Sequence, residues 1–162
     1  MINIVIKGRK MDKITQVKPS LYLGYGIHAR FKTDDFEKLG IDVIINCCNE
    51  IRHKPNNNKK YIVEQYPIDD DGLDNSFVGY LEKIVDQINY YLNNGKKIYV
   101  HCVQGISRSA AIIIYYLMKY DKLSYDNAYV RLLLLRPCIC LNENFVRELK
   151  NRDKFGSKDD EF

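Results

Sequence analysis

The fold is decided by residues 97–120, which read KIYVHCVQGISRSAAIIIYYLMKY. This stretch begins with residues typical of a strand and ends with an apolar run as long as a buried helix. Between them lie the nine residues HCVQGISRS, and α/β proteins place their binding sites beyond the carboxyl ends of strands. We therefore expect a strand at 97–100, a helix from Ser109 to about Tyr120, and a functional loop between them.

The rest of the chain alternates between strand-like and helix-like segments. Strands are expected at 20–24, 41–46 and 61–66, the last two of them buried. Helices are expected at 33–39, at 77–92, from Ser124 to about Arg136, and after Asn142. This alternation predicts a single α/β domain whose central, mostly parallel sheet is flanked by helices. We place an N-terminal extension at residues 1–13, the folded domain at 14–152 and a disordered tail at 153–162.

Composition excludes several classes of protein. The 162 residues carry a net charge of +4, which suits an anionic substrate but is too weak for a typical nucleic-acid binder, so no nucleic-acid partner is expected. We find no secretory signal and no run long enough for membrane insertion. Five cysteines without a C-x-x-C pair favour reduced thiols in an intracellular protein, cytoplasmic or nuclear. The three histidines show no ligand spacing with the cysteines, so neither a metal nor a cofactor is expected.

The loop between the strand and the helix has the properties of an anion site. Five residues separate Cys102 from Arg108, enough for one tight turn whose backbone N–H groups can surround a tetrahedral anion. Gly105 allows a backbone turn that other residues resist, and the helix that starts near Arg108 adds its positive N-terminal end. We expect the phosphate-binding residues to be Val103, Gln104, Gly105, Ile106, Ser107 and Arg108.

The side chains of this segment fit phosphoryl transfer through sulfur. A thiolate attacks phosphorus, so Cys102 is the candidate nucleophile, its pKa lowered by the surrounding N–H groups and the helix terminus. The planar fork of Arg108 suits two equatorial phosphate oxygens. Ser109 is positioned to donate a hydrogen bond to the Cys102 sulfur when that sulfur leaves, and His101 fixes the loop.

Several segments resemble one known family. HCVQGISRS resembles the signature loop of the protein tyrosine phosphatase superfamily, and residues 14–149 resemble its small, atypical dual-specificity phosphatases. The matching segments are ITQVKPSLYLG, LGIDVIINCCNE, SRSAAIIIYYLMK and RPCICLNENF, although Leu141 replaces the usual Pro. The resemblance implies a phosphatase that removes phosphate from phosphotyrosine and phosphoserine or phosphothreonine of protein substrates through a phosphocysteine intermediate.

The resemblance also implies a general acid in a loop about thirty residues before the cysteine. QYPIDDD resembles the family segment in which the acid is the third residue after Pro, which here is Asp70; Asp71 and Asp69 stay open as alternatives. By the same resemblance Asn142 holds this loop near the site, and Asn46 supports the phosphate loop from the adjacent strand.

Three other activities occur among the relatives of such phosphatases. Phosphoinositide phosphatases carry Lys within the loop, whereas the variable loop positions here are uncharged. RNA 5′-phosphatases usually have Thr after the Arg and a stronger basic surface, whereas this chain has Ser109. Relatives that only bind phosphoproteins commonly lose the nucleophile, whereas Cys102 is present.

Two further features each have two interpretations. Cys48 lies at the end of a predicted strand in INCCNE, which resembles a stretch of the tensin-related phosphoinositide phosphatase, where a cysteine in this position pairs with the nucleophile. Cys48 is therefore either a redox partner of Cys102 or a small buried residue. Leu134, in the run RLLLLR, either faces outward as a contact for a homodimer or partner, or belongs to a wide buried stripe.

Overall fold

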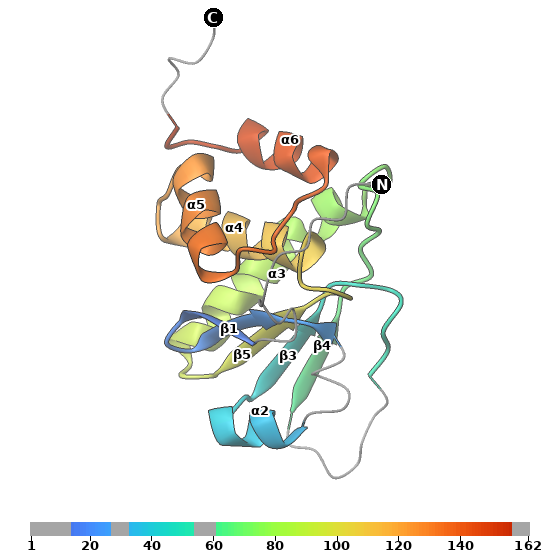
Figure 1. Cartoon of the computed structure of the whole chain (residues 1–162), viewed down its shortest axis with the longest axis vertical. Coiled ribbons are helices and arrows are strands. Elements are labelled where there is room, and N and C mark those ends of the chain that lie inside the picture. Colours follow the sequence, from blue (N-terminus) through green and yellow to red (C-terminus); the bar gives the residue numbers. More distant parts are fainter. Residues whose placement is uncertain (1–13, 27–32, 54–60, 157–162) are drawn as a thin grey trace, which may run out of the picture.

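The computed structural model describes residues 14–26, 33–53 and 61–156 (Figure 1). These residues build one five-stranded sheet in the order β1-β2-β5-β3-β4. β1 runs antiparallel to β2, and the other neighbouring strands are parallel. The predicted extension at 1–13 and the end of the predicted tail, 157–162, lie outside the described residues. The strands are β1 (Thr15–Lys18), β2 (Leu21–Gly24), β3 (Val43–Asn46), β4 (Ile62–Gln65) and β5 (Ile98–His101).

Helices cover both faces of the sheet, as the alternating pattern predicts (Figure 1). α2 lies on one face, where Phe36 packs into a small cluster with Tyr99 and Ile44. The other helices that the structure describes lie on the opposite face and enclose the larger core. The helices are α2 (Thr33–Leu39), α3 (Ser76–Asn93), α4 (Arg108–Tyr120), α5 (Tyr125–Leu135) and α6 (Glu143–Asn151).

The central helix is α4, which starts directly after the loop that follows β5. Every residue of α4 from Arg108 to Met118 is buried, because α3, α5 and α6 all pack against it. A helix that is apolar on every face must be buried on every side, and the packing around α4 meets this requirement. Burial also fixes the position of its N-terminus beneath the loop.

The strand expected at 20–24 is present as β2, but β1 before it was not predicted, and the burial predicted for 61–66 is wrong. The segment before Gly24 contains two strands, because Pro19 and Ser20 form a turn that separates β1 from β2. β1 is only four residues long, so its alternating burial gives little signal. The segment 61–66 does form a strand, but β4 is not buried: Ile62 and Val63 are 45% and 43% exposed. β4 ends the strand order and pairs only with β3, which explains this exposure.

The orientation of α5 agrees with the prediction for Leu134. Ser124 caps the helix, its side chain accepting a hydrogen bond from the Asn127 N–H. Ala128 and Leu132 are buried, whereas Leu134 is 78% exposed. The alternative of a buried stripe that includes Leu134 is therefore wrong, while a dimer through this residue stays a prediction. Within the described ranges, no helix is sufficiently long and apolar to cross a bilayer.

Candidate active site

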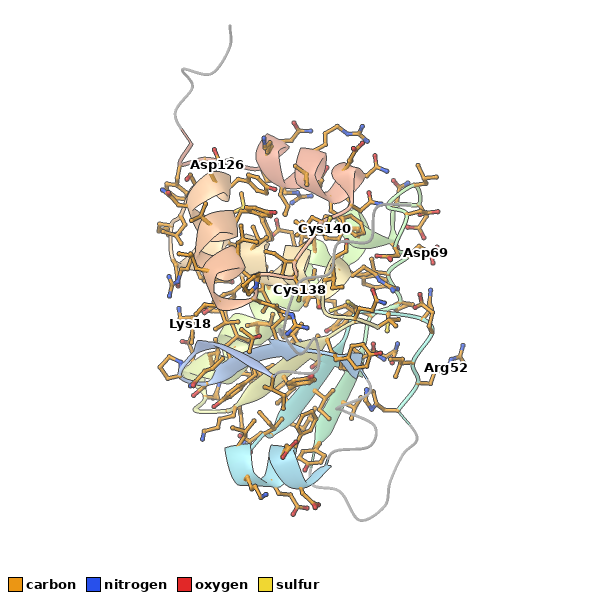
Figure 2. The ribbon with its side chains drawn as sticks, in the orientation of Figure 1. Lys18, Arg52, Asp69, Asp126, Cys138 and Cys140 are labelled. Carbon is orange, nitrogen blue, oxygen red and sulfur yellow. The ribbon has the colours of Figure 1, made fainter. Side chains whose placement is uncertain are left out.

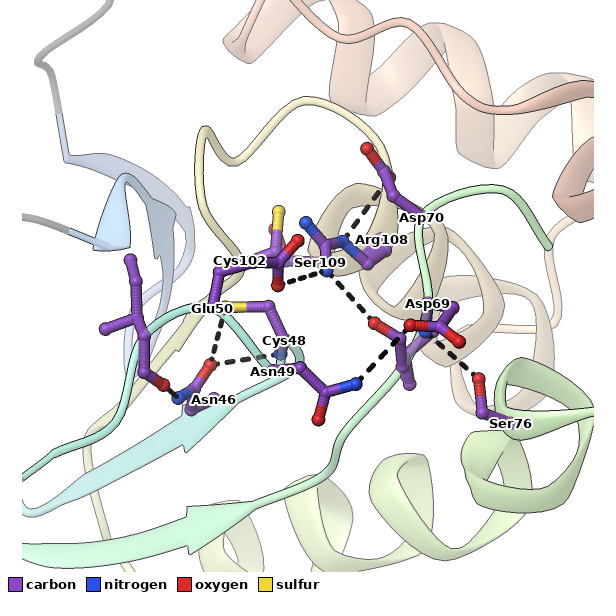
Figure 3. A network of polar contacts seen from close by, with 12 residues as sticks. Asn46, Cys48, Asn49, Glu50, Asp69, Asp70, Ser76, Cys102, Arg108 and Ser109 are labelled. Carbon is purple, nitrogen blue, oxygen red and sulfur yellow. Dashed lines mark hydrogen bonds and ion pairs between the residues drawn. The ribbon is translucent and has the colours of Figure 1, made fainter. Parts of the chain in front are cut away.

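The predicted loop residues, apart from Gly105, line a cleft of about 650 Å³ at the carboxyl ends of the parallel strands. Cys102 follows β5, Glu50 follows β3 and Asp70 follows β4, so three strand ends contribute side chains (Figure 3). The lining residues are Glu50, Asp70, Cys102, Val103, Gln104, Ile106, Ser107, Arg108, Cys140, Leu141 and Asn142.

A buried arginine holds two carbonyl groups of the loop. Arg136, at the end of α5, donates from Nε to the Gly105 carbonyl oxygen at 2.7 Å and from Nη2 to that of Gln104 at 3.2 Å. Its Nη1 reaches the Thr15 hydroxyl on β1 at 3.2 Å. Because the N–H and C=O groups of a peptide point in opposite directions, fixing these carbonyls toward Arg136 turns the neighbouring N–H groups toward the cleft.

Two neighbouring carbonyls of the loop are held by other parts of the chain. The Gly26 N–H donates to the Val103 oxygen at 3.0 Å, and the Cys140 N–H donates to the Ile106 oxygen at 3.0 Å. The loop is thus tied to the segment after β2 and to the segment between α5 and α6. Together with Arg136, these bonds make it a preformed ring of N–H donors.

Gly105 is required by this ring. Its φ of +63° lies in the left-handed region, and a Cβ there would clash with the Gly24 carbonyl. The resulting turn aims the Gly105 N–H at the Cys102 sulfur, at 3.3 Å. Ser109 Oγ donates to the same sulfur at 3.2 Å. Cys102 is 3% exposed, and Ser109 belongs to the first turn of α4, so the sulfur lies beside both donors and the N-terminus of that helix.

Arg108 is buried, with its guanidinium in the cleft (Figure 3). Nη1 donates to Glu50 Oε2 at 2.8 Å and to the Ile68 carbonyl at 3.0 Å. Nε lies 3.3 Å from Asp70 Oδ1, an ion-pair distance, but makes no hydrogen bond to any described group. Burial alone would lower the Arg108 pKa, but the hydrogen bond to Glu50 and the nearby charges of Cys102 and Asp70 raise it overall, so the guanidinium stays charged.

The acidic loop after β4 presents one of its three candidate carboxylates to the cleft. Asp70 lines the cleft and faces Arg108, whereas the Asp71 carboxylate accepts from the Leu73 N–H at 2.9 Å. Asn142 Nδ2 donates to the Asp70 carbonyl at 3.0 Å, so Asn142 contacts the loop that carries Asp70.

Asp69 points to a different environment. Its carboxylate lies 3.4 Å from Asn49 Nδ2, and its backbone N–H bonds Ser76 Oγ (Figure 3). A hydrogen bond with Asp74 raises the Asp69 pKa, a property that would suit an acid. Asp69 does not line the cleft, however, so among the three carboxylates position favours Asp70.

His101 and its neighbour fix the base of the loop. His101 is fully buried and its Nδ1 bonds the Cys102 carbonyl at 2.8 Å, while its Nε2 lies 2.7 Å from Nε2 of His53. Burial lowers the His101 pKa to about 4, despite the bond to the Cys102 carbonyl. A neutral ring that donates from Nδ1 must accept at Nε2, so His53 is the donor of the second bond. His101 thus has the location expected of a residue that fixes the loop.

Asn46 is buried at the end of β3 and organises the segment that follows. Its Nδ2 donates to the Ile51 carbonyl at 2.5 Å, and its Oδ1 accepts from both the N–H and the thiol of Cys48, each at 3.0 Å. The side chain therefore bonds Cys48 and Ile51, which lie on either side of Glu50. Burial raises the Cys48 pKa to about 11, so this thiol is protonated at neutral pH, and its redox role stays a prediction.

Sequence reasoning missed two charged residues at the site. Glu50 contacts Arg108, and Arg136 secures the loop through the carbonyl of Gly105, 31 positions earlier in the chain. A charged residue four positions after the end of a buried strand was the available signal for Glu50. Arg136 precedes a proline at a helix end, and nothing in that local pattern separates it from a solvent-exposed C-terminal arginine.

Comparisons with known proteins identify the family of this chain. Residues 21–154 match the family model for the dual specificity phosphatase catalytic domain. The chain is 30% identical over 155 residues to the dual specificity protein phosphatase PHS1 of Arabidopsis thaliana, covering 94% of this chain and 16% of PHS1. It is 30% identical over 145 residues to human dual specificity protein phosphatase 12, covering 89% and 42%. The chain therefore spans less than half the length of these two relatives.

A solved structure gives a likeness that covers nearly its full length. The human tyrosine phosphatase-like serine/threonine/tyrosine-interacting protein has a TM-score of 0.79 and 30% identity, covering 87% of this chain and 95% of that one. The expected mostly parallel α/β fold is thereby confirmed. The family match covers most of the chain and includes the whole loop from Cys102 to Arg108. This chain belongs to the dual specificity phosphatase family.

Proposed function

We propose that this domain removes phosphate from phosphotyrosine and from phosphoserine or phosphothreonine of protein substrates. The observation that carries the proposal is the Cys102 sulfur, which accepts from Gly105 N–H and Ser109 Oγ at the base of a cleft that Arg108 also lines. Both donors point at the sulfur atom that would attack phosphorus, and a thiolate is the nucleophilic form of cysteine. The family match supports the same activity.

The first step forms a bond from sulfur to phosphorus. The Cys102 thiolate attacks the phosphoryl group while the bond from phosphorus to the substrate oxygen breaks, and Asp70 gives its proton to that oxygen. The loop N–H groups and the Nε and Nη2 atoms of Arg108 bind the equatorial oxygens. Phosphate binding displaces Asp70 from its ion pair with Arg108, which frees its carboxyl group for the leaving oxygen.

The second step returns the enzyme to its starting state. Water attacks the phosphocysteine, the bond from sulfur to phosphorus breaks, and the Asp70 carboxylate takes a proton from the water. Ser109 Oγ, 3.2 Å from the sulfur, stabilises the departing Cys102 thiolate. Inorganic phosphate is released, and the two steps together need only the enzyme, the substrate and water.

The remaining assignments belong to the same proposal. We place the catalytic domain at residues 14–152. Asp153, one residue beyond this end, accepts a hydrogen bond from the Tyr125 N–H. The stability of a series of C-terminal truncations tests where the domain ends. The substrates are phosphoproteins in the cytoplasm or nucleus, where the five reduced cysteines are stable.

The test is a phosphate-release assay on a phosphotyrosine peptide, a phosphothreonine peptide, a phosphoinositide and an RNA with a 5′-triphosphate. We expect turnover of both peptides and none of the other two. Cys102→Ser should fold yet lose all turnover, and Arg108→Lys should lose nearly as much because Lys has no planar fork. Residual activity in Cys102→Ser would refute the mechanism. Peptide binding without turnover by the wild-type protein would indicate a binding module instead.

A further inference from the structure

Glu50 has a defined position at the mouth of the cleft. The Asn46 side chain forms hydrogen bonds with Cys48 and Ile51, on either side of Glu50. Gln65 Nε2 also donates to the Cys48 carbonyl at 2.5 Å. Glu50 therefore does not depend on Arg108 alone for its location. Its side chain is 53% exposed, so the carboxylate touches Arg108 on one side and solvent on the other.

The bond between Glu50 and Arg108 is compatible with a bound phosphate. Nη1 carries two hydrogens, and both are used, by Glu50 Oε2 and by the Ile68 carbonyl. A phosphate oxygen pair therefore takes Nε and Nη2, the other edge of the fork. Glu50 stays in place during the reaction and keeps a negative charge beside the reacting group. Its hydrogen bond to Arg108 lowers the Glu50 pKa, so the carboxylate is ionised at neutral pH.

Among the described residues that line the cleft, negatively charged side chains outnumber positively charged ones. Among the described residues that line the cleft, Arg108 is the one cation, and the two carboxylates are Glu50 and Asp70. Arg52 is close to Glu50 in sequence, but it is exposed and projects outward from the fold (Figure 2). The loop N–H groups and Arg108 match one phosphate, and a second anionic group at the mouth would meet carboxylates only.

We propose that Glu50 selects the substrate segment: it favours a single phosphorylated residue flanked by Lys or Arg and disfavours acidic flanks or a second phosphate. The inference rests on the proposed phosphatase function. It follows the rule that specificity arises as much from repulsion of wrong partners as from attraction of the right one. An exposed charge pair changes binding by a modest amount, so a cationic and an anionic flank should differ by about tenfold in kcat/KM.

The experiment uses the full chain and two phosphotyrosine peptides that differ only in Lys or Glu on both sides of the phosphorylated residue. A third peptide carries a second phosphate nearby, and an aryl phosphate without flanks reports the chemical step. The test variant is Glu50→Gln, which keeps a hydrogen-bond acceptor for Arg108 and removes the charge. The matched control is Glu37→Gln, which changes net charge equally on exposed α2, away from the cleft.

We expect the wild-type protein and Glu37→Gln to prefer the Lys-flanked peptide about tenfold, and Glu50→Gln to prefer it about threefold or less. The wild-type preference should shrink as salt is added, because exposed charges are screened. An equal preference in wild type and Glu50→Gln would overturn the proposal. If Glu50→Gln loses turnover, the preference between the two peptides can be measured as a ratio of binding affinities. Calorimetry on Cys102→Ser, with and without the Glu50→Gln change, gives that ratio. Failure of wild type on the aryl phosphate would instead refute the phosphatase function.

Discussion

Replacing Arg136 should weaken both the fold and the anion site. Arg136 is buried and donates two hydrogen bonds to loop carbonyls and one to β1. A bond from a charged donor contributes about 1.5–3 kcal/mol, and a buried carbonyl left without a donor carries a desolvation cost. We therefore expect Arg136→Ala to lower the free energy of unfolding by about 3–5 kcal/mol, which corresponds to roughly 10 °C in Tm for a domain of this size.

Urea unfolding followed by circular dichroism measures this loss, and inhibition of aryl phosphate hydrolysis by inorganic phosphate measures the site. Phosphate should inhibit Arg136→Ala much more weakly, since the freed carbonyls no longer hold the N–H groups toward the cleft. Arg131→Ala is the matched control on the same helix, because its ion pair with Asp121 is exposed and contributes about 1 kcal/mol or less. If Arg136→Ala were as stable as Arg131→Ala and equally inhibited by phosphate, the structural role given to Arg136 would be refuted.

Four more predictions concern single side chains. Asp70→Asn should slow phosphotyrosine cleavage at least a hundredfold but leave an activated aryl phosphate nearly unaffected; the same pattern in Asp71→Asn would move the acid by one residue. The His101 pKa of about 4 lies below its ordinary value of about 6.5, so the stability gained from keeping this ring neutral is complete above pH 6.5 and is lost as pH falls toward 4. Urea titrations should show about 3 kcal/mol lost across that window, and a flat profile would contradict the neutral buried ring. After mild peroxide and then a thiol reductant, wild type should recover activity and Cys48→Ser should recover poorly; equal recovery without a disulfide-linked peptide would exclude the redox pair. Leu134→Lys should abolish a dimer in sedimentation, and a wild-type protein that is monomeric at all concentrations would exclude that dimer.

The sequence predicted those features that depend on short patterns. The nine residues from His101 to Ser109 are contiguous, so the ring of donors, the nucleophile and the arginine fork could be identified together. Ser124 and Asn142 lie directly before periodic segments, and both cap helices in the structure. Position-specific resemblance, rather than local physics, singled out Asp70 from its acidic neighbours.

The missed features depend on contacts between distant segments. Arg136 acts on the loop through the packing of α5, and its bond to Thr15 spans 121 positions. Glu50 reaches Arg108 only because β3 and β5 are neighbours in the sheet. The burial of β4 was overestimated because strand order cannot be read from its apolar residues, and an edge strand has the same composition as a central one.

The ring of anchored carbonyls also determines how the site can adapt. Ordering a flexible loop around a ligand costs conformational entropy, and that cost reduces affinity. Here Gly26, Arg136 and Cys140 have already fixed the loop before any phosphate arrives. The proposed phosphate pocket is therefore preformed, and it does not distinguish between the groups to which a phosphate is attached. Any discrimination between one substrate and another must come from the side chains around it, at the mouth of the cleft.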